Sequence, residues 1–234
     1  MTKILLVTLI AFSLFAGIFA QNNVDSPKQV SFSTDDGGTI YGLEYGKGTR
    51  GVVLAHGGRF NKESWSKQAD TLVRSGFRVI AIDFRGYAKS TGPGQDDLFT
   101  APLHLDVLAG VRYLHNSGAK SVSVVGGSLG GGAGADAVTV MKPGEIARLV
   151  TLGGLMGNLR PEKINVPLLV ITTRNDANAA GPRLPNIQAA FDKVPGKRKK
   201  LVILEGSAHA QFMFDTDQSE KIMKMIVKFL KKKK

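Results

Sequence analysis

The stretch SVSVVGGSLGGGAGADAVTV, residues 121–140, is the part of the sequence that indicates the fold most clearly. Its first five residues predict a short buried strand, and the small residues from 129 to 140 suit a helix packed closely against a sheet. Between them lies Gly126-Gly127-Ser128-Leu129-Gly130, a G-x-S-x-G pattern typical of a sharp turn that lifts a serine hydroxyl above the sheet. Such a pattern also arises by chance in a chain with 28 glycines, so the strand–turn–helix context carries the prediction that Ser128 is a nucleophile.

Strand-like and helix-like segments alternate on both sides of this stretch. The other expected strands are 30–34, 39–45, 51–55, 78–83, 148–152, 166–172 and 200–204. The expected helices are 62–75, 102–115, 129–140, 185–194 and 216–230. This alternation predicts an α/β fold, with a mostly parallel sheet flanked by helices on both faces. The connection 153–165 is too short for a lid domain, so we expect an open site that suits short acyl chains.

Two further candidates follow later strands of the predicted sheet. Asp176 comes shortly after strand 166–172, and His209 follows strand 200–204. Functional side chains gather at the carboxyl ends of strands in such sheets, and the chain order Ser, Asp, His accompanies a serine on this kind of turn. We therefore predict a catalytic triad in which His209 takes the proton of Ser128 and Asp176 orients the imidazole.

A glycine turn after strand 51–55 offers backbone donors to the same site. Its sequence, His56-Gly57-Gly58-Arg59, leaves N–H groups unblocked by side chains. An oxyanion hole needs such donors near the reacting carbonyl oxygen. We expect the N–H of Leu129 to be one donor and that of Gly58 or Arg59 to be the other.

Two other residues at strand ends have structural interpretations. Asp83 precedes the candidate serine, and Arg85 beside it is the expected ion-pair partner. His56 also precedes the serine, whereas a serine on such a turn takes its base from a later part of the chain. We expect His56 to hold its loop by hydrogen bonds.

Apolar residues near the candidate triad are expected to line a substrate pocket, although a place in the core is the alternative for each. They are Phe60, Trp65, Met156, Phe212 and Met213. The chain has no cysteine and only four histidines, which excludes thiolate metal sites and cysteine nucleophiles. The histidines lack the spacing of zinc motifs, so we expect no metal and no other cofactor.

The first 20 residues have the layout of a secretory signal peptide, with Lys3, an apolar run and the small residue Ala20. A membrane anchor is the alternative, but 4–20 is at the short limit for a spanning helix and no basic cluster follows it. We expect cleavage near Ala20 and export to the periplasm or the medium. Residues 21–234 have a length that suits a single domain with one large core.

The formal net charge is +12, and much of the excess lies in the runs 197–200 and 231–234. A solvated surface is the simpler interpretation of these runs. The alternative is weak electrostatic contact with anionic surfaces through the lysines from Lys231 to Lys234. No aromatic residues are interleaved with these charges, so no nucleic-acid partner is expected.

From about residue 30 to residue 230 the chain resembles the α/β-hydrolase superfamily, in particular its small lidless esterases and dienelactone-hydrolase-like members. The motifs that carry the resemblance are HGG at 56–58, DFRGYAKS at 83–90, GGSLGG at 126–131, RND at 174–176 and HAQF at 209–212. The resemblance implies an α/β-hydrolase fold without a lid domain, built on an eight-stranded sheet with one antiparallel strand near its start. It also implies a monomer or small oligomer.

Two positions depart from the pattern of this superfamily. Ala88 replaces the second glycine of D-x-R-G-x-G-x-S, which concerns a loop conformation. The dienelactone hydrolases proper carry a cysteine where this chain has Ser128, so their particular activity is not implied. The resemblance implies instead a serine hydrolase that cleaves a small-molecule carboxylic ester through an acyl-enzyme. The alternative is a catalytically silent binding protein on the same fold.

Overall fold

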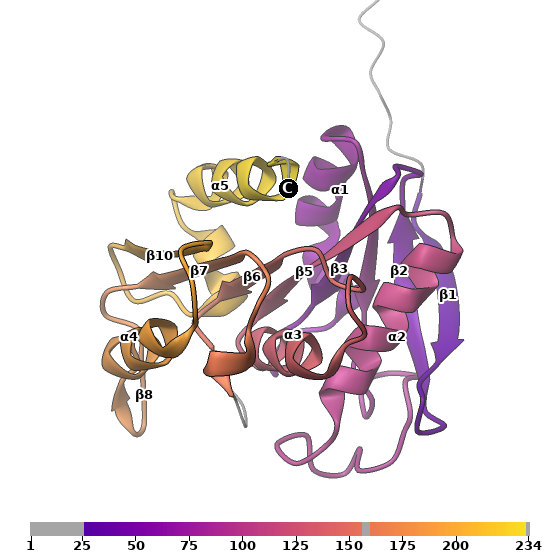
Figure 1. Ribbon diagram of the computed structural model, residues 1–234, viewed down its shortest axis with the longest axis horizontal. Helices are drawn as coiled ribbons and strands as arrows, with labels where there is room; N and C mark the ends of the chain where they lie inside the picture. The colour runs from indigo at the N-terminus through magenta and orange to yellow at the C-terminus, as the bar shows by residue number, and fades with distance from the viewer. Residues whose placement is uncertain (1–25, 156–159, 233–234) are drawn as a thin grey trace, which may run out of the picture.

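The computed structural model describes residues 26–155 and 160–232, which build an eight-stranded sheet between two layers of helices (Figure 1). The strand order is β1-β2-β4-β3-β5-β6-β7-β10, and β2 pairs antiparallel with both neighbours while the remaining pairs are parallel. The strands are β1 (Lys28–Ser33), β2 (Thr39–Tyr45), β3 (Arg50–Ala55), β4 (Phe77–Ile82), β5 (Ser121–Gly127), β6 (Leu149–Leu152), β7 (Leu168–Thr173) and β10 (Lys199–Leu204).

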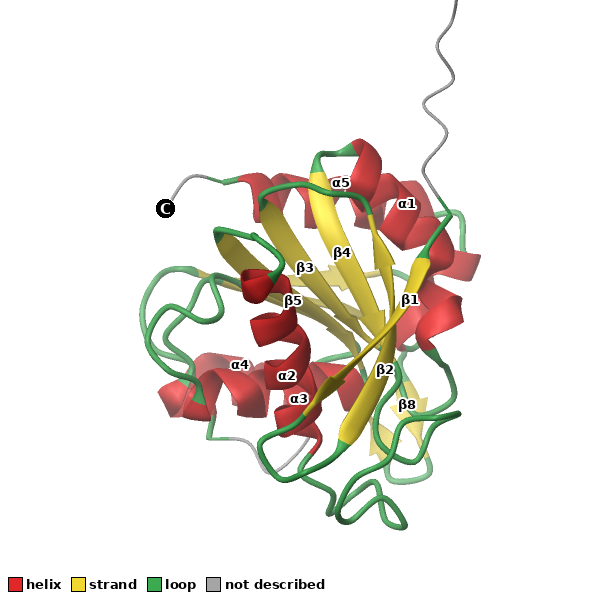
Figure 2. Ribbon diagram, turned by 90° about the vertical axis from the view of Figure 1, so that its right-hand side faces the viewer, coloured by secondary structure: helices red, strands yellow, loops and turns green. Residues whose placement is uncertain are grey.

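Helices cover the two faces unequally. Helices α1 (Ser66–Arg74) and α5 (Ser219–Lys231) pack on one face, and α2 (Leu103–Asn116), α3 (Leu129–Val140) and α4 (Leu184–Lys193) pack on the other (Figures 1 and 2). Each face carries its own cluster of buried apolar side chains. The central strands are apolar on both sides because both sides are covered, as in other parallel sheets.

All eight expected strands and all five expected helices are present, so the predicted fold class is confirmed. Several boundaries differ. The expected helix 62–75 begins as a 3₁₀ turn, Lys62–Trp65, because the Asn61 side chain accepts a hydrogen bond from the N–H of Ser64 and caps it. The expected helix 216–230 starts at Ser219, after a separate 3₁₀ segment, Ala210–Asp215.

Two small elements were not expected. A small hairpin follows β7, made of two strands of two residues each, β8 (Ala177–Asn178) and β9 (Gly181–Pro182). A 3₁₀ turn spans Pro161–Lys163. The described part of the connection between β6 and β7 contains no other element, and no lid domain is evident in the described chain.

Glycines let α3 approach the sheet closely, as the small residues of 121–140 indicate. A Cβ on Gly126 would lie 2.2 Å from the carbonyl oxygen of Gly130. A Cβ on Gly130 would lie 2.2 Å from the carbonyl oxygen of Ala55 in β3. Any side chain at either position would therefore push α3 and the turn before it out of place.

The expected signal peptide, residues 1–20, lies outside the described residues. Among the residues that are described, no helix is both long enough and apolar enough to cross a bilayer.

A buried arginine anchors the long loop between β4 and α2. The side chain of Arg85 is fully buried, and its guanidinium bonds to Asp106 of α2, with N–O distances of 2.6 and 2.9 Å. It also pairs with Asp36 in the turn between β1 and β2, at 2.6 Å, and donates to the carbonyl of Pro93 at 2.8 Å. Arg85 thus pairs with Asp36 and Asp106, and its expected pairing with Asp83 is wrong. The loop that it fixes includes Ala88, whose φ of 48° is a conformation that glycine adopts more readily than alanine.

The Asp36–Arg85 pair makes the free energy of unfolding depend on pH in the acidic range. Hydrogen bonds from Arg85, opposed by burial and helped by Thr34, lower the pKa of Asp36 from 3.8 to about 2. A group with a lowered folded-state pKa contributes stability above its unfolded pKa, and that contribution is lost as the pH falls through the folded value. Asp36→Asn should therefore lower the free energy of unfolding by about 2 kcal/mol at pH 7, a difference that shrinks below pH ~4 and vanishes near pH ~2.

Urea denaturation of both proteins across that pH range measures this difference. The matched control is Asp35→Asn, because Asp35 is next in the chain but is 64% exposed where it pairs with Arg112. Its substitution should cost less than about 1 kcal/mol at pH 7. Equal losses from the two substitutions would contradict the role given to the Arg85 pair.

Candidate active site

Ser128 occupies the turn between β5 and α3. Its backbone φ is 49°, a conformation that residues with a side chain seldom adopt and that is held here by the surrounding structure. Its N–H donates to the carbonyl of Leu152 at 2.8 Å, and its carbonyl accepts from the N–H of Gly132 at 3.0 Å. The serine therefore lies at the N-terminus of α3, where the helix dipole favours negative charge.

His209 lies between the serine and a buried carboxylate. Its Nε2 is 2.8 Å from Ser128 Oγ, and its Nδ1 is 2.6 Å from Asp176 Oδ2. The ring needs space on the side of β6, since a Cβ on Gly153 would lie 2.7 Å from His209 Cε1. The structure thus brings the three predicted triad residues, from three different strand ends, into one hydrogen-bonded chain.

Asp176 is fully buried and is held from a second side by Arg183. Arg183 Nε lies 3.3 Å from Asp176 Oδ1, and the Arg183 N–H donates to the Asp176 carbonyl at 2.9 Å. The hairpin β8–β9 carries the chain from one residue to the other. The sequence analysis missed Arg183, because two-residue strands leave no periodic pattern that would reveal the hairpin.

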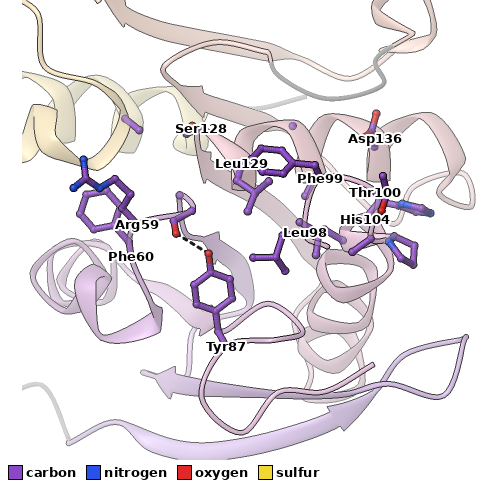
Figure 3. A pocket seen from close by; sticks show the side chains of 18 of the residues that line it. Arg59, Phe60, Tyr87, Leu98, Phe99, Thr100, His104, Ser128, Leu129 and Asp136 are labelled. Carbon is purple, nitrogen blue, oxygen red and sulfur yellow. Dashed lines mark hydrogen bonds between the residues drawn. The ribbon is translucent and has the colours of Figure 1, made fainter. Parts of the chain in front are cut away.

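The glycine turn after β3 lies beside the serine, and most of its backbone groups have partners. The Gly57 N–H donates to Gln211 Oε1 at 2.7 Å, and the Gly58 carbonyl accepts from the Tyr87 hydroxyl at 2.7 Å (Figure 3). The N–H of Gly57 therefore already has an acceptor. Gly58 and Arg59, two exposed residues that line the cavity with Leu129, remain the candidate donors of this turn.

Gln211 is a buried residue that the sequence analysis missed. Besides accepting from Gly57, it donates from Nε2 to Ser64 Oγ at 2.7 Å. It lies two residues after His209, so one side chain ties the glycine turn to the histidine loop. The only sequence signal was its place in HAQF, which does not reveal that Gly57 is its partner.

His56 and Asp83 are both fully buried beneath the glycine turn. His56 Nδ1 is 2.8 Å from the Gly57 carbonyl, and the Phe84 N–H donates to His56 Nε2 at 3.3 Å, in agreement with the expected structural role. Burial is the largest influence on the pKa of His56 and lowers it, so the ring is neutral. Asp83 pairs with Lys62, at an N–O distance of 2.6 Å.

A cavity of about 820 Å³ opens above Ser128 and His209. Phe60 and Phe212 line it as expected, with ring centroids 4.8 Å apart. The expectations for Trp65 and Met213 are wrong: both are at most 1% exposed and belong to the apolar cluster under α1 and α5, where Trp65 packs edge-on against Phe214. The expected pocket residue Met156 lies outside the described residues.

The loop between β4 and α2 supplies a wall of the cavity that the sequence analysis did not foresee. Tyr87, Leu98, Phe99 and Thr100 come from this loop, and His104 follows on α2 (Figure 3). The loop contains no helix or strand of its own, so periodicity assigned it no place. The hydrogen bonds that Arg85 makes at the start of this loop hold the loop over the site.

The chain belongs to a family described as having the alpha/beta hydrolase fold, whose model matches residues 51–202. The match supports a place among the hydrolases that share this fold.

Curated relatives and solved structures agree with this placement. The chain is 35% identical to a non-heme haloperoxidase of Rhodococcus erythropolis over 53% of this chain and 43% of the relative. It is 34% identical to an epoxide hydrolase of Caballeronia sordidicola over 33% of this chain and 22% of the relative. The chain spans less than half the length of these relatives.

Among solved structures, an esterase of Pyrococcus furiosus aligns with a TM-score of 0.74 at 20% identity, covering 88% of this chain and 90% of that one. An esterase of Exiguobacterium antarcticum aligns with a TM-score of 0.70 at 19% identity, covering 88% of this chain and all of that one. At such identities the likeness establishes the fold alone.

Proposed function

We propose that the protein is a serine hydrolase that cleaves carboxylic esters through an acyl-enzyme intermediate. The observation that carries this proposal is the chain of contacts from Ser128 Oγ through His209 to Asp176, at 2.8 and 2.6 Å, with the serine facing a cavity. A serine hydroxyl is a weak nucleophile alone, and an adjacent base held by a third group is what activates it.

In the first half of the reaction, Ser128 Oγ attacks the ester carbonyl carbon while His209 Nε2 takes the hydroxyl proton. The carbonyl oxygen becomes negative and receives hydrogen bonds from the N–H of Leu129 and from that of Gly58 or Arg59. The protonated His209 then gives its proton to the alkoxide oxygen of the substrate. The alcohol leaves, and the acyl group remains bonded to Ser128.

In the second half, a water molecule attacks the acyl carbon and His209 takes one of its protons. Collapse of this intermediate releases the carboxylic acid and returns the proton to Ser128 Oγ. Throughout, Asp176 accepts a hydrogen bond from Nδ1, which keeps Nε2 as the basic nitrogen of the neutral ring and stabilises the charged ring. The ion pair with Arg183 holds Asp176 in this orientation.

We infer the substrate class from the chemical groups at the site, a serine hydroxyl beside a histidine base. A serine hydroxyl with a histidine base suits acyl transfer, and esterases are among the proteins with the same fold. The relatives named for epoxide hydrolysis or halogenation provide the competing activities to include in an assay panel.

The direct test uses a fluorophosphonate, whose phosphorus is attacked by an activated serine with loss of fluoride. We expect residues 21–234 to take up one probe per chain, with the labelled peptide containing Ser128, as measured by intact mass and peptide mapping. A folded protein that no fluorophosphonate labels would contradict the proposal and favour a silent binding protein on this fold.

Gln211 should position the oxyanion donors. Gln211→Met keeps the side-chain length but removes the acceptor that holds the Gly57 N–H, so the neighbouring donors lose their alignment. We expect kcat for a p-nitrophenyl ester to fall about 10- to 100-fold with KM within about threefold, because an oxyanion donor acts mainly in the transition state.

The matched control is Ser64→Ala, which removes the partner of Gln211 Nε2 and an exposed hydrogen bond to the Asn61 carbonyl, but leaves the bond from Gly57 to Gln211. It should leave kcat within about threefold of the wild type. Equal effects of the two substitutions on kcat, or a loss from Gln211→Met that is confined to thermal stability, would rule out the positioning role.

A further inference from the structure

Large apolar side chains that are strongly exposed gather at one place in the described structure. Phe99, Val140 and Phe212 are 90%, 51% and 41% exposed, and all three line the cavity that holds Ser128. Exposed apolar groups that cluster rather than scatter mark a surface that meets an apolar partner. The rim of this cavity is therefore built for an apolar ligand.

The floor of the cavity is one face of α3. Leu129, Gly132, Ala133, Asp136 and Val140 line it, at spacings of three and four residues that place them along a single side of the helix. The small residues at 132 and 133 leave open space above the helix backbone. From Leu129 to Asp136 this floor runs for about 10 Å along the helix axis.

The wall opposite α3 is also apolar near the serine. Leu98 and Phe99 face the cavity close to Leu129, while His104 and Asp136 lie at the far end (Figure 3). The cavity is thus an apolar groove that begins at Ser128 and ends at polar groups. Burial raises the pKa of the Asp136 carboxyl at that end.

These dimensions do not suit the short acyl chains expected for a site without a lid. An acetyl group on Ser128 would leave most of the 820 Å³ filled with water in contact with apolar walls. Building on the proposed serine hydrolase activity, we propose that the substrate is an ester with an apolar chain of about six to ten carbons, which runs along α3 from Ser128 toward Asp136. A length of about 10 Å holds roughly eight extended carbons.

Reactivity should therefore depend on chain length. Each methylene taken from water into an apolar site can improve binding by up to about fourfold, and partial exposure of the groove reduces this gain. We expect kcat/KM to rise about tenfold or more between the two-carbon and eight-carbon members of a series. It should level off or fall beyond about ten carbons, where a chain would meet His104 and Asp136.

The experiment measures the second-order rate of inactivation by fluorophosphonates that carry methyl, butyl, octyl or dodecyl chains. The same lengths are assayed as p-nitrophenyl alkanoates, which vary the acyl side, and as alkyl acetates, which vary the alcohol side. All substrates are kept below their aggregation concentrations. The ester series that shows the rise identifies which side of the ester lies in the groove.

Two variants test the location. Phe99→Ser removes an apolar side chain from the exposed wall of the groove, and Phe99→Asp places a carboxylate at the same position. Each should lower the ratio of the octyl-probe rate to the methyl-probe rate about fivefold or more. The matched control is Asn116→Asp, which adds the same charge at the last residue of α2, outside the cavity, and should change neither rate.

The outcomes separate this inference from the proposed function. Labelling of Ser128 at rates that do not increase with chain length would overturn the groove assignment and leave the serine hydrolase proposal intact. A chain-length preference that Phe99→Asp and Asn116→Asp affect equally would also overturn it. Failure of every fluorophosphonate to label the folded protein would overturn both.

Discussion

Ser128→Ala should reduce the turnover of p-nitrophenyl esters by at least about 10³-fold and abolish fluorophosphonate labelling. The substitution removes the only atom of the triad that forms a bond to the substrate, while His209 and Asp176 keep their contact. Residual turnover would come from the oxyanion donors and from binding alone. Initial rates with purified variant and wild type, compared at equal folded concentration, measure the effect.

The matched control for this result is Ser123→Ala. Ser123 is a buried serine in β5, five residues before the candidate nucleophile. The Ser123→Ala variant should keep turnover within about twofold of the wild type. A Ser128→Gly variant adds a second readout. Glycine tolerates the φ of 49° at this position, so this inactive variant should unfold at a temperature equal to or above that of the wild type. Substantial esterase activity in Ser128→Ala would assign the nucleophile elsewhere.

Asp176→Asn should lower kcat by about 10²- to 10⁴-fold with the fold intact. An amide at this position offers an N–H as well as an oxygen to His209 Nδ1, so the imidazole can adopt the tautomer that leaves Nε2 protonated and unable to accept the proton of Ser128. It also withdraws the charge that stabilises the protonated ring. Circular dichroism, with kcat measured from pH 6 to pH 9, separates the loss of rate from a loss of fold.

Asp83→Asn is the informative comparison, because both aspartates are buried at strand ends. Asp83 accepts a hydrogen bond from Lys62. Burial acts to lower the pKa of Lys62, but its hydrogen bonds to Asp83 and Glu63 outweigh burial and raise that pKa. Removal of one member of a buried pair costs about 3 kcal/mol of stability. We expect Asp83→Asn to be less stable yet to keep kcat within about tenfold. A greater loss of kcat in Asp83→Asn than in Asp176→Asn would mean that the acid of the site is Asp83.

The elements of the sheet could be predicted from the chain because their signals are local. Buried parallel strands are short apolar runs, and helices carry a periodic stripe of apolar residues. Gly126, Ser128 and Gly130 indicate the turn between β5 and α3. The order of Ser128, Asp176 and His209 along these elements was enough to nominate the candidate triad. Strand ends on the same edge of a parallel sheet meet in space whatever the loops between them do.

The pocket could not be predicted in the same way. Phe60 lies close to Trp65 in the chain, and Phe212 lies next to Met213; all four side chains are apolar. Yet Phe60 and Phe212 line the cavity, whereas Trp65 and Met213 lie in the core. Consecutive side chains of a 3₁₀ segment point about 120° apart, so Phe212 and Met213 face different sides of the same segment. No periodic pattern over so few residues reveals which side faces the cavity.

The α/β class, the strand-end positions of the candidate triad and a helix of small residues packed closely on the sheet could all be predicted from the sequence. Three features are visible only in the folded chain: Arg183 holds Asp176, Gln211 connects the glycine turn to the histidine loop, and the loop after β4 forms a wall over α3. The first group follows from local propensity and parallel-sheet topology. The second depends on single side chains that meet across long separations in the chain, and such contacts arise only when the whole core is packed.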